Sequence, residues 1–290
     1  PISVPYAPGA KFHAYTTREP VGVIGQIIPW NFPLLMAAWK LGPALATGNC
    51  VILKPAEQTP LTALRLGEIL QEAGVPDGVV NIVPGMGETA GAALAAHDEV
   101  DKVAFTGSTA IGRHLTTMAS DHMTPVLMEL GGHAPVIVCE DTDVKAAAVS
   151  GSSRKMRNAG QVCTSPTRFF VHDQIFDEFL QHFTDRAAAT VVGNGMERGV
   201  EMGPLANHRR ITALSEFVDD ARNKGADLMT GGSRINAKGY FFEPTVLANV
   251  PDSARVMQEE PFGPLAIVNP VGSLDEAIER ANSVPYGLAA

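Results

Sequence analysis

The sequence contains few cysteines and no long apolar run. Three cysteines in 290 residues are too few, and odd in number, for a disulfide framework, which is typical of a reducing compartment. No apolar run approaches the roughly 20 residues that span a bilayer. Residues 1–5 show neither the basic nor the apolar part of a signal peptide. We therefore predict a cytoplasmic protein with no membrane partner.

Basic residues are also scarce. The chain has 22 Lys and Arg against 31 Asp and Glu, a formal net charge of −9, whereas a nucleic-acid partner requires a clustered cationic surface. The eight histidines are scattered, and Cys-x-x-Cys and His-Glu-x-x-His spacings are missing, so we predict no metal site. The missing Gly-x-Ser-x-Gly motif disfavours a serine hydrolase. Hydrophobic residues make up 45% of the chain, which is enough for a large buried core.

Short β-rich runs alternate with helical patterns in the first half of the chain. The runs are residues 21–28, 51–54, 79–83 and 103–105. Each is followed by a turn and a helical pattern, in cycles of about two dozen residues, as in βαβ units. One helix is expected to have Thr59 as its N-cap and Pro60 as its first residue, and to end near Gly74. We therefore predict an α/β fold with a parallel, Rossmann-like sheet covered by helices.

The pattern changes after residue 126, where two short runs flank Gly131 and Gly132. Helices are then expected near residues 143–158, 176–189 and 210–225, with a strand at 167–171. The length suggests about two domains. We divide the chain into an extended segment at 1–19, a cofactor domain at 20–131 and a second α/β domain at 132–290. Both ends look cut, because neither has the polar sequence usual at a terminus, so we expect an internal piece of a longer polypeptide.

Two glycine-rich turns follow predicted strands, where α/β folds bind phosphates. The first contains Gly85, Gly87 and Gly91, and the second extends from Gly107 to Gly112; neither fits a standard fingerprint. Each turn alone is equally compatible with a glycine that packs a strand against a helix. Two of them on successive turns favour a nucleotide.

Lys54 ends another predicted strand, and Glu57 follows three residues later. A lysine at that strand end can donate to ribose hydroxyls. The glutamate can accept from the same hydroxyls and disfavours a 2′-phosphate. The alternative interpretation is a solvated Lys–Glu pair on the surface.

Cys163 is the candidate nucleophile. Gly160 permits a tight turn before it, and polar neighbours such as Gln161 are not typical of a core. A catalytic thiolate needs partial exposure and a positive local environment. Cys50 and Cys139 lie in apolar runs and fit the commoner role of a buried small hydrophobe.

Three further polar residues are open between a structural and a chemical role. Glu129 ends an apolar run, where a carboxylate must find a partner or take up a proton easily, so it suits a structural ion pair or a general base. Asn31 lies in an apolar turn and is either a satisfied turn residue or an oxyanion donor. Glu260, next to a second glutamate and a proline, is equally ambiguous.

Six short motifs occur in a specific order and spacing. They are Pro29-Trp30-Asn31-Phe32-Pro33, Lys54-Pro55-Ala56-Glu57, Phe105-Thr106-Gly107-Ser108-Thr109, Glu129-Leu130-Gly131-Gly132, Asn158-Ala159-Gly160-Gln161-Val162-Cys163 and Glu260-Pro261-Phe262-Gly263-Pro264. Through them the chain resembles the NAD(P)-dependent aldehyde dehydrogenase superfamily over essentially its whole length. The resemblance implies a homodimer or homotetramer, with residues 1–19 as an oligomerisation segment. It also implies that the start of the cofactor domain and the C-terminal end are absent.

The resemblance implies a role for each matching residue. Cys163 would attack the aldehyde carbonyl, and the Asn31 amide with the Cys163 N–H would hold the oxyanion. Glu129 would activate the water that hydrolyses the thioester, and Lys54 is counted with both the catalytic and the cofactor residues. The cofactor is expected to be NAD rather than NADP, because of Glu57. The residues expected to bind it are Ile28, Pro29, Trp30, Lys54, Glu57, Gly87, Phe105, Thr106, Gly107, Ser108, Ile111, Leu130, Glu260 and Phe262.

Two residues bear on the small aldehyde substrate. Arg157 matches an arginine that succinate-semialdehyde members use on the substrate carboxylate, but Trp39 stands where those members have a second arginine. We expect an apolar or aromatic aldehyde, or a semialdehyde held differently. The alternatives are a CoA-acylating semialdehyde dehydrogenase, which Glu129 argues against, a non-catalytic homologue, and a thiol esterase.

Overall fold

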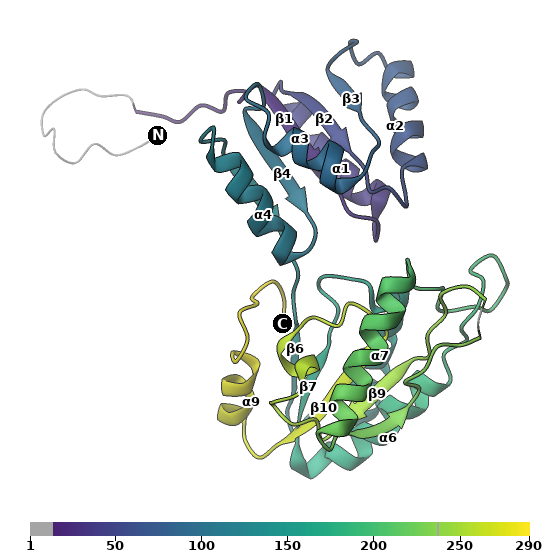
Figure 1. The fold of residues 1–290 in the computed structure, drawn as a ribbon. Coiled ribbons are helices and arrows are strands. Elements are labelled where there is room, and N and C mark those ends of the chain that lie inside the picture. The colour runs from purple at the N-terminus through teal and green to yellow at the C-terminus, as the bar shows by residue number, and fades with distance from the viewer. Residues whose placement is uncertain (1–13, 237) are drawn as a thin grey trace, which may run out of the picture. The chain divides into compact units, whose positions relative to one another are not determined.

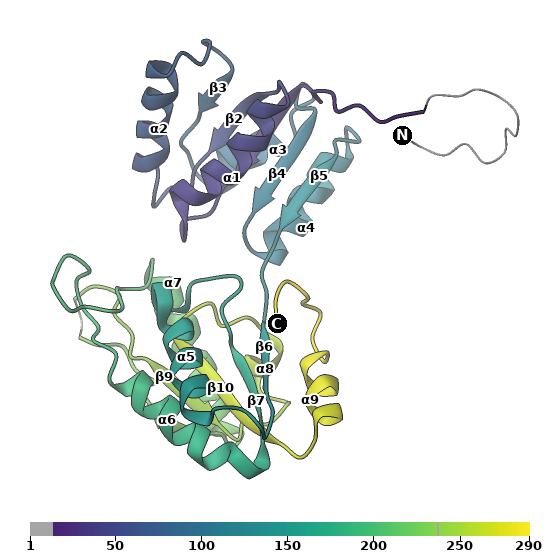
Figure 2. The same cartoon turned by 180° about the vertical axis from the view of Figure 1, so that it is seen from behind.

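The computed structural model describes residues 14–236 and 238–290, and the chain divides into two compact units, Pro1–Glu129 and Leu130–Ala290. Each unit contains one five-stranded sheet covered by helices (Figures 1 and 2). The α/β class predicted from the sequence is therefore confirmed. Most of the expected oligomerisation segment, residues 1–13, lies outside the described residues, and residues 14–19 form neither helix nor strand.

Unit 1 is built on a fully parallel sheet, sheet A, with the strand order β3-β2-β1-β4-β5. Its strands are β1 (Val23–Ile27), β2 (Cys50–Lys54), β3 (Val80–Ile82), β4 (Lys102–Thr106) and β5 (Val126–Glu129). The inner strands are almost continuously apolar, as expected where helices cover both faces. The strand order reverses between β1 and β4, because the chain proceeds from β1 to β2 and β3 on one side and from β4 to β5 on the other. Ligands of doubly wound sheets bind at this position.

The helices of unit 1 cover both faces of sheet A. They are α1 (Pro33–Ala46), α2 (Leu61–Glu72), α3 (Ala92–Ala95), which continues a π-helical turn η1 (Gly87–Gly91), and α4 (Thr109–Ser120). Helix α1 packs beside α2 on one face, and α3 packs beside α4 on the other (Figures 1 and 2). Ile24 and Leu53 belong to the core under α1 and α2, whereas Gly25 faces Leu94 of α3. The alternation of faces along a strand thus places side chains under both helical layers.

The predicted capping of α2 is wrong. The helix begins at Leu61, and Pro60 precedes it with helical backbone angles while its carbonyl already accepts from the Leu64 N–H at 3.0 Å. The Thr59 hydroxyl is buried and has no hydrogen-bond partner among the described residues. The Thr59 N–H instead closes a turn on the Ala56 carbonyl at 3.1 Å, so its side chain does not take the capping position.

Unit 2 is built on sheet B, with the order β6-β7-β10-β9-β8, in which β8 is antiparallel to its neighbour. Its strands are β6 (Pro135–Val138), β7 (Arg168–His172), β8 (Asp227–Thr230), β9 (Thr245–Ala248) and β10 (Leu265–Val271). Its helical segments are α5 (Val144–Met156), η2 (Arg157–Gly160), η3 (Asp173–Ile175), α6 (Phe176–Ala188), α7 (His208–Asn223), α8 (Arg255–Gln258) and α9 (Leu274–Ala281). Helices α5 and α6 pack together on one face, and α7 lies on the opposite face (Figures 1 and 2).

Three phenylalanines join β7 to α6 in the core of unit 2. The rings of Phe169 and Phe183 meet edge to face with centroids 4.8 Å apart, and Phe179 stacks on Phe183 at 5.7 Å. All three side chains are buried, so the amphipathic face of α6 is fixed on the sheet. This packing supports the layer that carries α5 and the segment following it.

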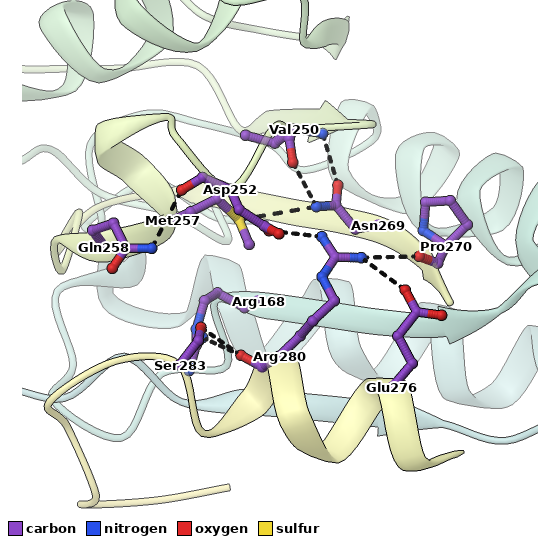
Figure 3. A network of polar contacts seen from close by, with 10 residues as sticks. All are labelled: Arg168, Val250, Asp252, Met257, Gln258, Asn269, Pro270, Glu276, Arg280 and Ser283. Carbon is purple, nitrogen blue, oxygen red and sulfur yellow. Dashed lines mark hydrogen bonds and ion pairs between the residues drawn. The ribbon is translucent and has the colours of Figure 1, made fainter. Parts of the chain in front are cut away.

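A polar network anchors the segment between β9 and β10 (Figure 3). The guanidinium of Arg280 donates to the Asp252 carboxylate at 2.9 Å and to the Pro270 carbonyl at 3.2 Å. The Asn269 side chain makes two 2.8 Å bonds with the backbone of Val250. These contacts hold residues 250–258 on the sheet, immediately before Glu260.

Candidate active site

The carboxyl ends of the strands of sheet A gather most of the residues predicted to bind a cofactor. In the register of the sheet, Ile27 lies beside both Lys54 and Phe105, and Thr106 lies beside Glu129. The N–H of Ile28 donates to the Lys54 carbonyl at 3.1 Å. Parallel pairing thus brings the ends of β1, β2, β4 and β5 to one edge of unit 1, around the point where the strand order reverses.

Lys54 is a buried lysine. Its side chain is only 3% exposed, and its ammonium donates to the Pro55 carbonyl at 2.9 Å and lies 3.6 Å from the Glu57 carboxylate, whose side chain is 39% exposed. The alternative of a solvated surface pair is therefore wrong for the lysine, because the β2 end and its neighbours cover its stem. Glu57 keeps one side in solvent, where it can accept from a bound group.

The two glycine-rich turns of unit 1 differ in what their backbone donors do. In the first, the N–H groups of Thr89, Ala90 and Gly91 all point to the Met86 carbonyl, at 3.4, 3.0 and 3.3 Å. Those donors are consumed within the π-helical turn, and Gly87 is exposed with open space around its Cα. This first turn does not form a cradle of outward-pointing N–H groups.

The second turn leads directly into α4, a helix of 12 residues. Ser108 is its N-cap, and the Ser108 hydroxyl accepts from the Ile111 N–H at 3.4 Å. A side chain at Gly107 would collide with the buried ring of Phe105. This turn therefore requires glycine and presents a capped helix start at the carboxyl edge of sheet A, an arrangement suited to a phosphate.

The Pro-Trp-Asn segment follows β1 at the same edge. Pro29, Trp30 and Asn31 are half-buried and precede α1, whose first residue is Pro33. Trp39, on α1, has a side chain that is 63% exposed in this unit. The segment thus continues the line of strand-end residues that the sequence predicted.

Glu129 ends β5, the edge strand of sheet A, and is exposed. Its side chain faces outward, as alternate residues of an edge strand do. The charge of Glu129 acts on Lys40 of α1. Burial lowers the pKa of Lys40 to about 8, and attraction to Glu129 opposes that shift. The Glu129 side chain thus remains open to solvent.

Unit 2 carries Cys163 on a loop that begins in a strained conformation. Helix α5 ends at Met156, two residues before the expected end, because Asn158, Ala159 and Gly160 all adopt left-handed backbone angles, with φ of 52°, 53° and 67°. For residues other than glycine this conformation costs roughly 1–2 kcal/mol each. Such strain concentrates at functional sites and persists where surrounding contacts fix it.

Side-chain amides fix this loop. The Asn158 amide donates to the Gln161 carbonyl at 3.3 Å, and the Gln161 amide donates to the Asn158 carbonyl at 3.1 Å. The Gln161 side-chain oxygen also accepts from the Ala206 N–H at 2.9 Å. Cys163 follows and is half-buried, in contrast to a core cysteine.

Cys50 departs from its expectation. It was expected to be a buried small hydrophobe, but it is exposed at the first position of β2, where the strand has just emerged from the loop after α1. Cys139 is half-buried beyond the end of β6. Exposure alone does not separate the three thiols, so the loop around Cys163 distinguishes it.

The Gly-Gly pair packs directly against this loop and against Glu260. A Cβ on Gly132 would lie 2.6 Å from the Cys163 carbonyl oxygen, and one on Gly131 would collide with the Glu260 carboxylate. The other oxygen of that carboxylate accepts from the Gly132 N–H at 3.2 Å. Two glycines are therefore required for Cys163 and Glu260 to approach the same stretch of backbone.

The Glu260–Pro264 segment closes on the loop from the other side. A side chain on Gly160 would collide with the Gly263 carbonyl. Phe262 takes a positive φ of 41° and is half-buried, and Arg210 of α7 donates to the Pro261 carbonyl. Three segments far apart in the sequence thus meet around Cys163 within unit 2.

Buried charge surrounds Glu260. Burial raises the pKa of Glu260 to about 7, opposed by its bond from Gly132 and by the positive charges of Lys155 and Arg210. Burial lowers the pKa of Lys155 to about 7, and attraction to Glu260 acts against that shift. The sequence did not point to Lys155 or to Arg210 as part of this site. Lys155 lies in the last turn of a helix, where a lysine is ordinarily exposed.

His133, for which the sequence offered no role, is a buried neutral histidine. Its Nε2 donates to the Val256 carbonyl at 2.9 Å, while Nδ1 has no partner among the described residues. Burial, aided by the Arg168 charge, lowers its pKa to about 3. Arg168 donates to the His133 carbonyl at 3.0 Å. It also donates to the Arg280 carbonyl at 3.2 Å (Figure 3), so it ties the segment after the Gly-Gly pair to α9.

The remaining predicted residues are divided between the two units. Leu130 is half-buried at the start of unit 2, Arg157 is exposed just after α5, and Ile111 is exposed near the start of α4. Asn31, Lys54 and Glu129 thus belong to unit 1, and Cys163 and Glu260 to unit 2.

The described part of the chain contains neither a cluster suited to a metal ion nor a helix suited to a membrane. Across residues 14–236 and 238–290, no His, Cys, Asp and Glu side chains form a group of three or more that could hold a metal ion. Over the same residues, no helix has both the length and the apolar character needed to cross a membrane.

Comparison with known proteins gives a consistent result. The model of the aldehyde dehydrogenase family matches residues 3–290. Among curated relatives, mitochondrial aldehyde dehydrogenase of Leishmania tarentolae is 50% identical over 97% of this chain, and that of Homo sapiens is 48% identical over 96%. The chain spans 56% and 54% of those two proteins, about half their length.

A solved structure of similar fold supports the same grouping. The structure of an aldehyde dehydrogenase from Bacillus cereus in complex with NAD+ matches with a TM-score of 0.91 and 45% identity. The match covers 93% of this chain and 55% of that one. At this identity the likeness extends to sequence as well as fold.

Proposed function

The chain belongs to the aldehyde dehydrogenase family, and from this premise we propose that the protein oxidises an aldehyde to a carboxylic acid with NAD. The observation that carries the proposal is the loop of Cys163: a half-buried thiol after three left-handed residues, packed against Gly132. A structural cysteine needs no such loop, whereas a nucleophile that must meet a substrate in a fixed position does.

The carboxyl edge of sheet A suits a dinucleotide. Lys54 and Glu57 would bind the adenosine ribose, because a buried ammonium and a partly exposed carboxylate offer a donor and an acceptor side by side. Ser108 and the start of α4 would face a phosphate, next to a glycine that Phe105 forbids to carry a side chain. Glu57 would also repel a 2′-phosphate, which favours NAD over NADP.

The remaining cofactor contacts would come from the other predicted residues. Glu260 and Phe262 would hold the nicotinamide riboside. The rest of the cofactor site would be shaped by Ile28, Pro29, Trp30, Gly87, Thr106, Ile111 and Leu130. When bound, NAD supplies the acceptor for the hydride that leaves the substrate carbon.

The chemistry follows from Cys163, Asn31 and Glu129. The Cys163 thiolate adds to the aldehyde carbon, and the carbonyl oxygen becomes an oxyanion that the Asn31 amide and the Cys163 N–H would stabilise. Loss of hydride leaves a thioester on the sulfur. Glu129 would take a proton from a water molecule that attacks this thioester, which releases the acid and restores the thiol.

The substrate is an aldehyde whose class Trp39 and Arg157 would select. An exposed indole offers an apolar wall, and an exposed guanidinium offers one anchor for a carboxylate. This pair favours an apolar or aromatic aldehyde, or a semialdehyde held differently from one that meets two arginines. A cytoplasmic location and assembly into a homodimer or homotetramer remain predictions.

A panel of aldehydes tests the proposal in the purified full-length protein, with NAD and with NADP. We expect NADH formation in step with release of a free acid. Formation of acyl-CoA only when CoA is added would instead identify an acylating enzyme. Absence of NADH with every aldehyde, in protein that binds NAD, would reject aldehyde oxidation.

A further inference from the structure

Arg168 is a buried arginine at the start of β7, shortly after Cys163 in the sequence, and it is 1% exposed. Its Nε donates to the His133 carbonyl at 3.0 Å. Its two terminal nitrogens donate to the Arg280 carbonyl at 3.2 Å and to the Ala281 carbonyl at 3.0 Å, at the end of α9 (Figure 3). One rigid, planar group therefore joins the residue after the Gly-Gly pair to the end of a helix.

The partners of Arg168 are backbone carbonyls. Among the described residues its side chain donates to three of them and to no carboxylate, although burial of a cation is costly. Two of these carbonyls end α9, where a helix has unpaired acceptors and favours a positive charge. The third belongs to His133, which lies outside any helix or strand. Helix capping therefore explains two of the three bonds and leaves the bond to His133 to be explained.

The residue before His133 contacts both candidate residues of unit 2. The Gly132 N–H donates to the Glu260 carboxylate at 3.2 Å. A Cβ on Gly132 would lie 2.6 Å from the Cys163 carbonyl oxygen. A glycine has wide conformational freedom, so fixed neighbours must set the direction of its peptide groups. The contacts of His133 therefore decide where the Gly132 N–H points.

Two side-chain contacts hold His133 in place. Its carbonyl accepts from the Arg168 side chain, and its ring Nε2 donates to the Val256 carbonyl at 2.9 Å. The next carbonyl, that of Ala134, accepts from the Arg168 N–H at 3.3 Å. The ring contact acts through rotatable side-chain bonds, whereas the guanidinium acts on the peptide group itself. Arg168 is therefore the side chain that orients the backbone at this point.

We propose that Arg168 is a positioning residue of this site, which holds the backbone after Gly132 so that the Gly132 N–H meets the Glu260 carboxylate. The same hold keeps the Gly132 backbone against that of Cys163. The inference rests on the proposed function, in which Glu260 holds the nicotinamide riboside and Cys163 is the nucleophile. Release of the glycine backbone would withdraw a donor from the Glu260 carboxylate and leave that side chain less well fixed for the cofactor.

Arg280 offers a matched control, because it lies on the same aromatic ring. The guanidinium carbons of Arg168 and Arg280 are 5.7 and 5.2 Å from the centre of the Phe170 ring. The Arg280 side chain bonds to Asp252 and to the Pro270 carbonyl (Figure 3). Arg168 bonds to the backbone carbonyl of Arg280, which the variant Arg280→Met retains. Arg280→Met should therefore cost stability and leave the glycine segment in place.

Hydrogen exchange of the purified full-length protein without cofactor, resolved to single amides by mass spectrometry, tests the positioning. The measured quantity is the exchange rate of the Gly132 N–H relative to the amides of β9. This ratio should rise by about tenfold in Arg168→Met, because the peptide that fixes Gly132 is released locally. In Arg280→Met it should stay within about twofold of wild type. A merely structural arginine would speed both regions alike, and an equal ratio in the two folded variants overturns the proposal.

Calorimetry with NAD tests the functional half. Arg168→Met should raise the Kd by about tenfold, as expected for a lost hydrogen bond to a charged group, and Arg280→Met should leave it within about twofold. In the Glu260→Gln background, Arg168→Met should raise the Kd by much less, because the two residues act in series. A merely structural arginine lowers the amount of folded protein and leaves the Kd of the folded fraction unchanged. That result would overturn the role in cofactor binding.

A conservative variant covers the case in which Arg168→Met does not fold. Arg168→Lys keeps the charge but lacks the planar fork, so it cannot bond to His133 and to the end of α9 together. The Gly132 exchange ratio should still rise, by about threefold. Wild-type exchange and Kd in Arg168→Lys would show that charge alone suffices, which contradicts positioning by the guanidinium. Failure of the proposed function is distinguishable, because a protein that forms no NADH from any aldehyde still yields the exchange rates.

Discussion

The two units of this chain position their candidate residues in different ways. In unit 1, Lys54, Phe105 and Glu129 come from ends of parallel strands, and the register of the sheet alone brings those ends to one edge. In unit 2, Cys163 and Glu260 come from loops, and glycines that tolerate no Cβ bring them together. A regular sheet positions groups at little conformational cost, whereas the loops require strain, close backbone contacts and buried charge.

This difference matches the tasks proposed for the two units. Binding a dinucleotide requires several moderate contacts along an extended edge, which strand ends supply. A nucleophile must be held to within a fraction of an ångström, and left-handed residues locked by side-chain amides supply that rigidity. We therefore expect substitutions in unit 2 to be the more damaging.

Loss of the nucleophile should have the largest effect. Cys163→Ala should reduce NADH formation by about 10⁴-fold or more, because the covalent step disappears. Binding of NAD should persist, since the strand ends of unit 1 are untouched. Steady-state kinetics with calorimetry separates the two, and Cys50→Ala, at an exposed thiol, is the matched control. Substantial turnover in Cys163→Ala would remove the mechanism.

The chemical contribution of unit 1 should be large but selective. Glu129→Gln should slow steady-state turnover by about 10²–10³-fold, because water activation is lost while thiol attack is not. A first-turnover burst of NADH should remain in rapid-mixing experiments. Equal loss of the burst and the steady rate would show that Glu129 is not the base for deacylation.

A pair of glycine substitutions compares the backbones of the units. Gly160→Ala should lower the free energy of unfolding by about 3 kcal/mol or more, because φ is 67° and the methyl meets the Gly263 carbonyl. Gly87→Ala in unit 1, with open space around it, should change stability by less than about 1 kcal/mol. Urea unfolding measures both, and equal effects would contradict the contrast.

Substrate preference should give the smallest effect. Trp39→Arg adds a cation at an exposed position and should raise the kcat/KM ratio of succinate semialdehyde to an apolar aldehyde by about fivefold, as expected for a partly solvated ion pair. Trp39→Phe retains the apolar wall and should leave the ratio close to wild type. A ratio unchanged by the arginine would show that residue 39 does not contact substrate.

Sequence reasoning succeeded where local pattern decides structure. Apolar runs, turn residues and strand–helix alternation predicted the α/β class, and the Gly107 turn was predicted to start a helix, as it does. It was wrong where a neighbour decides. Thr59 was expected to cap α2, and Cys50 to be buried, but burial and capping depend on which residues pack nearby.

The sequence by itself determined the α/β class, through strand–helix alternation, and the family and the candidate nucleophile, through the order of the motifs. All of these depend on which residues follow one another. Only the tertiary structure decided that Glu260 packs on the Gly131–Gly132 pair, that Gly132 abuts the backbone of Cys163, and that Lys155 bonds to Ser165. Residues more than 100 positions apart have no local pattern that links them. The free energy of burying a charge depends on the polar and charged groups around it, and only the folding of the chain brings those groups together.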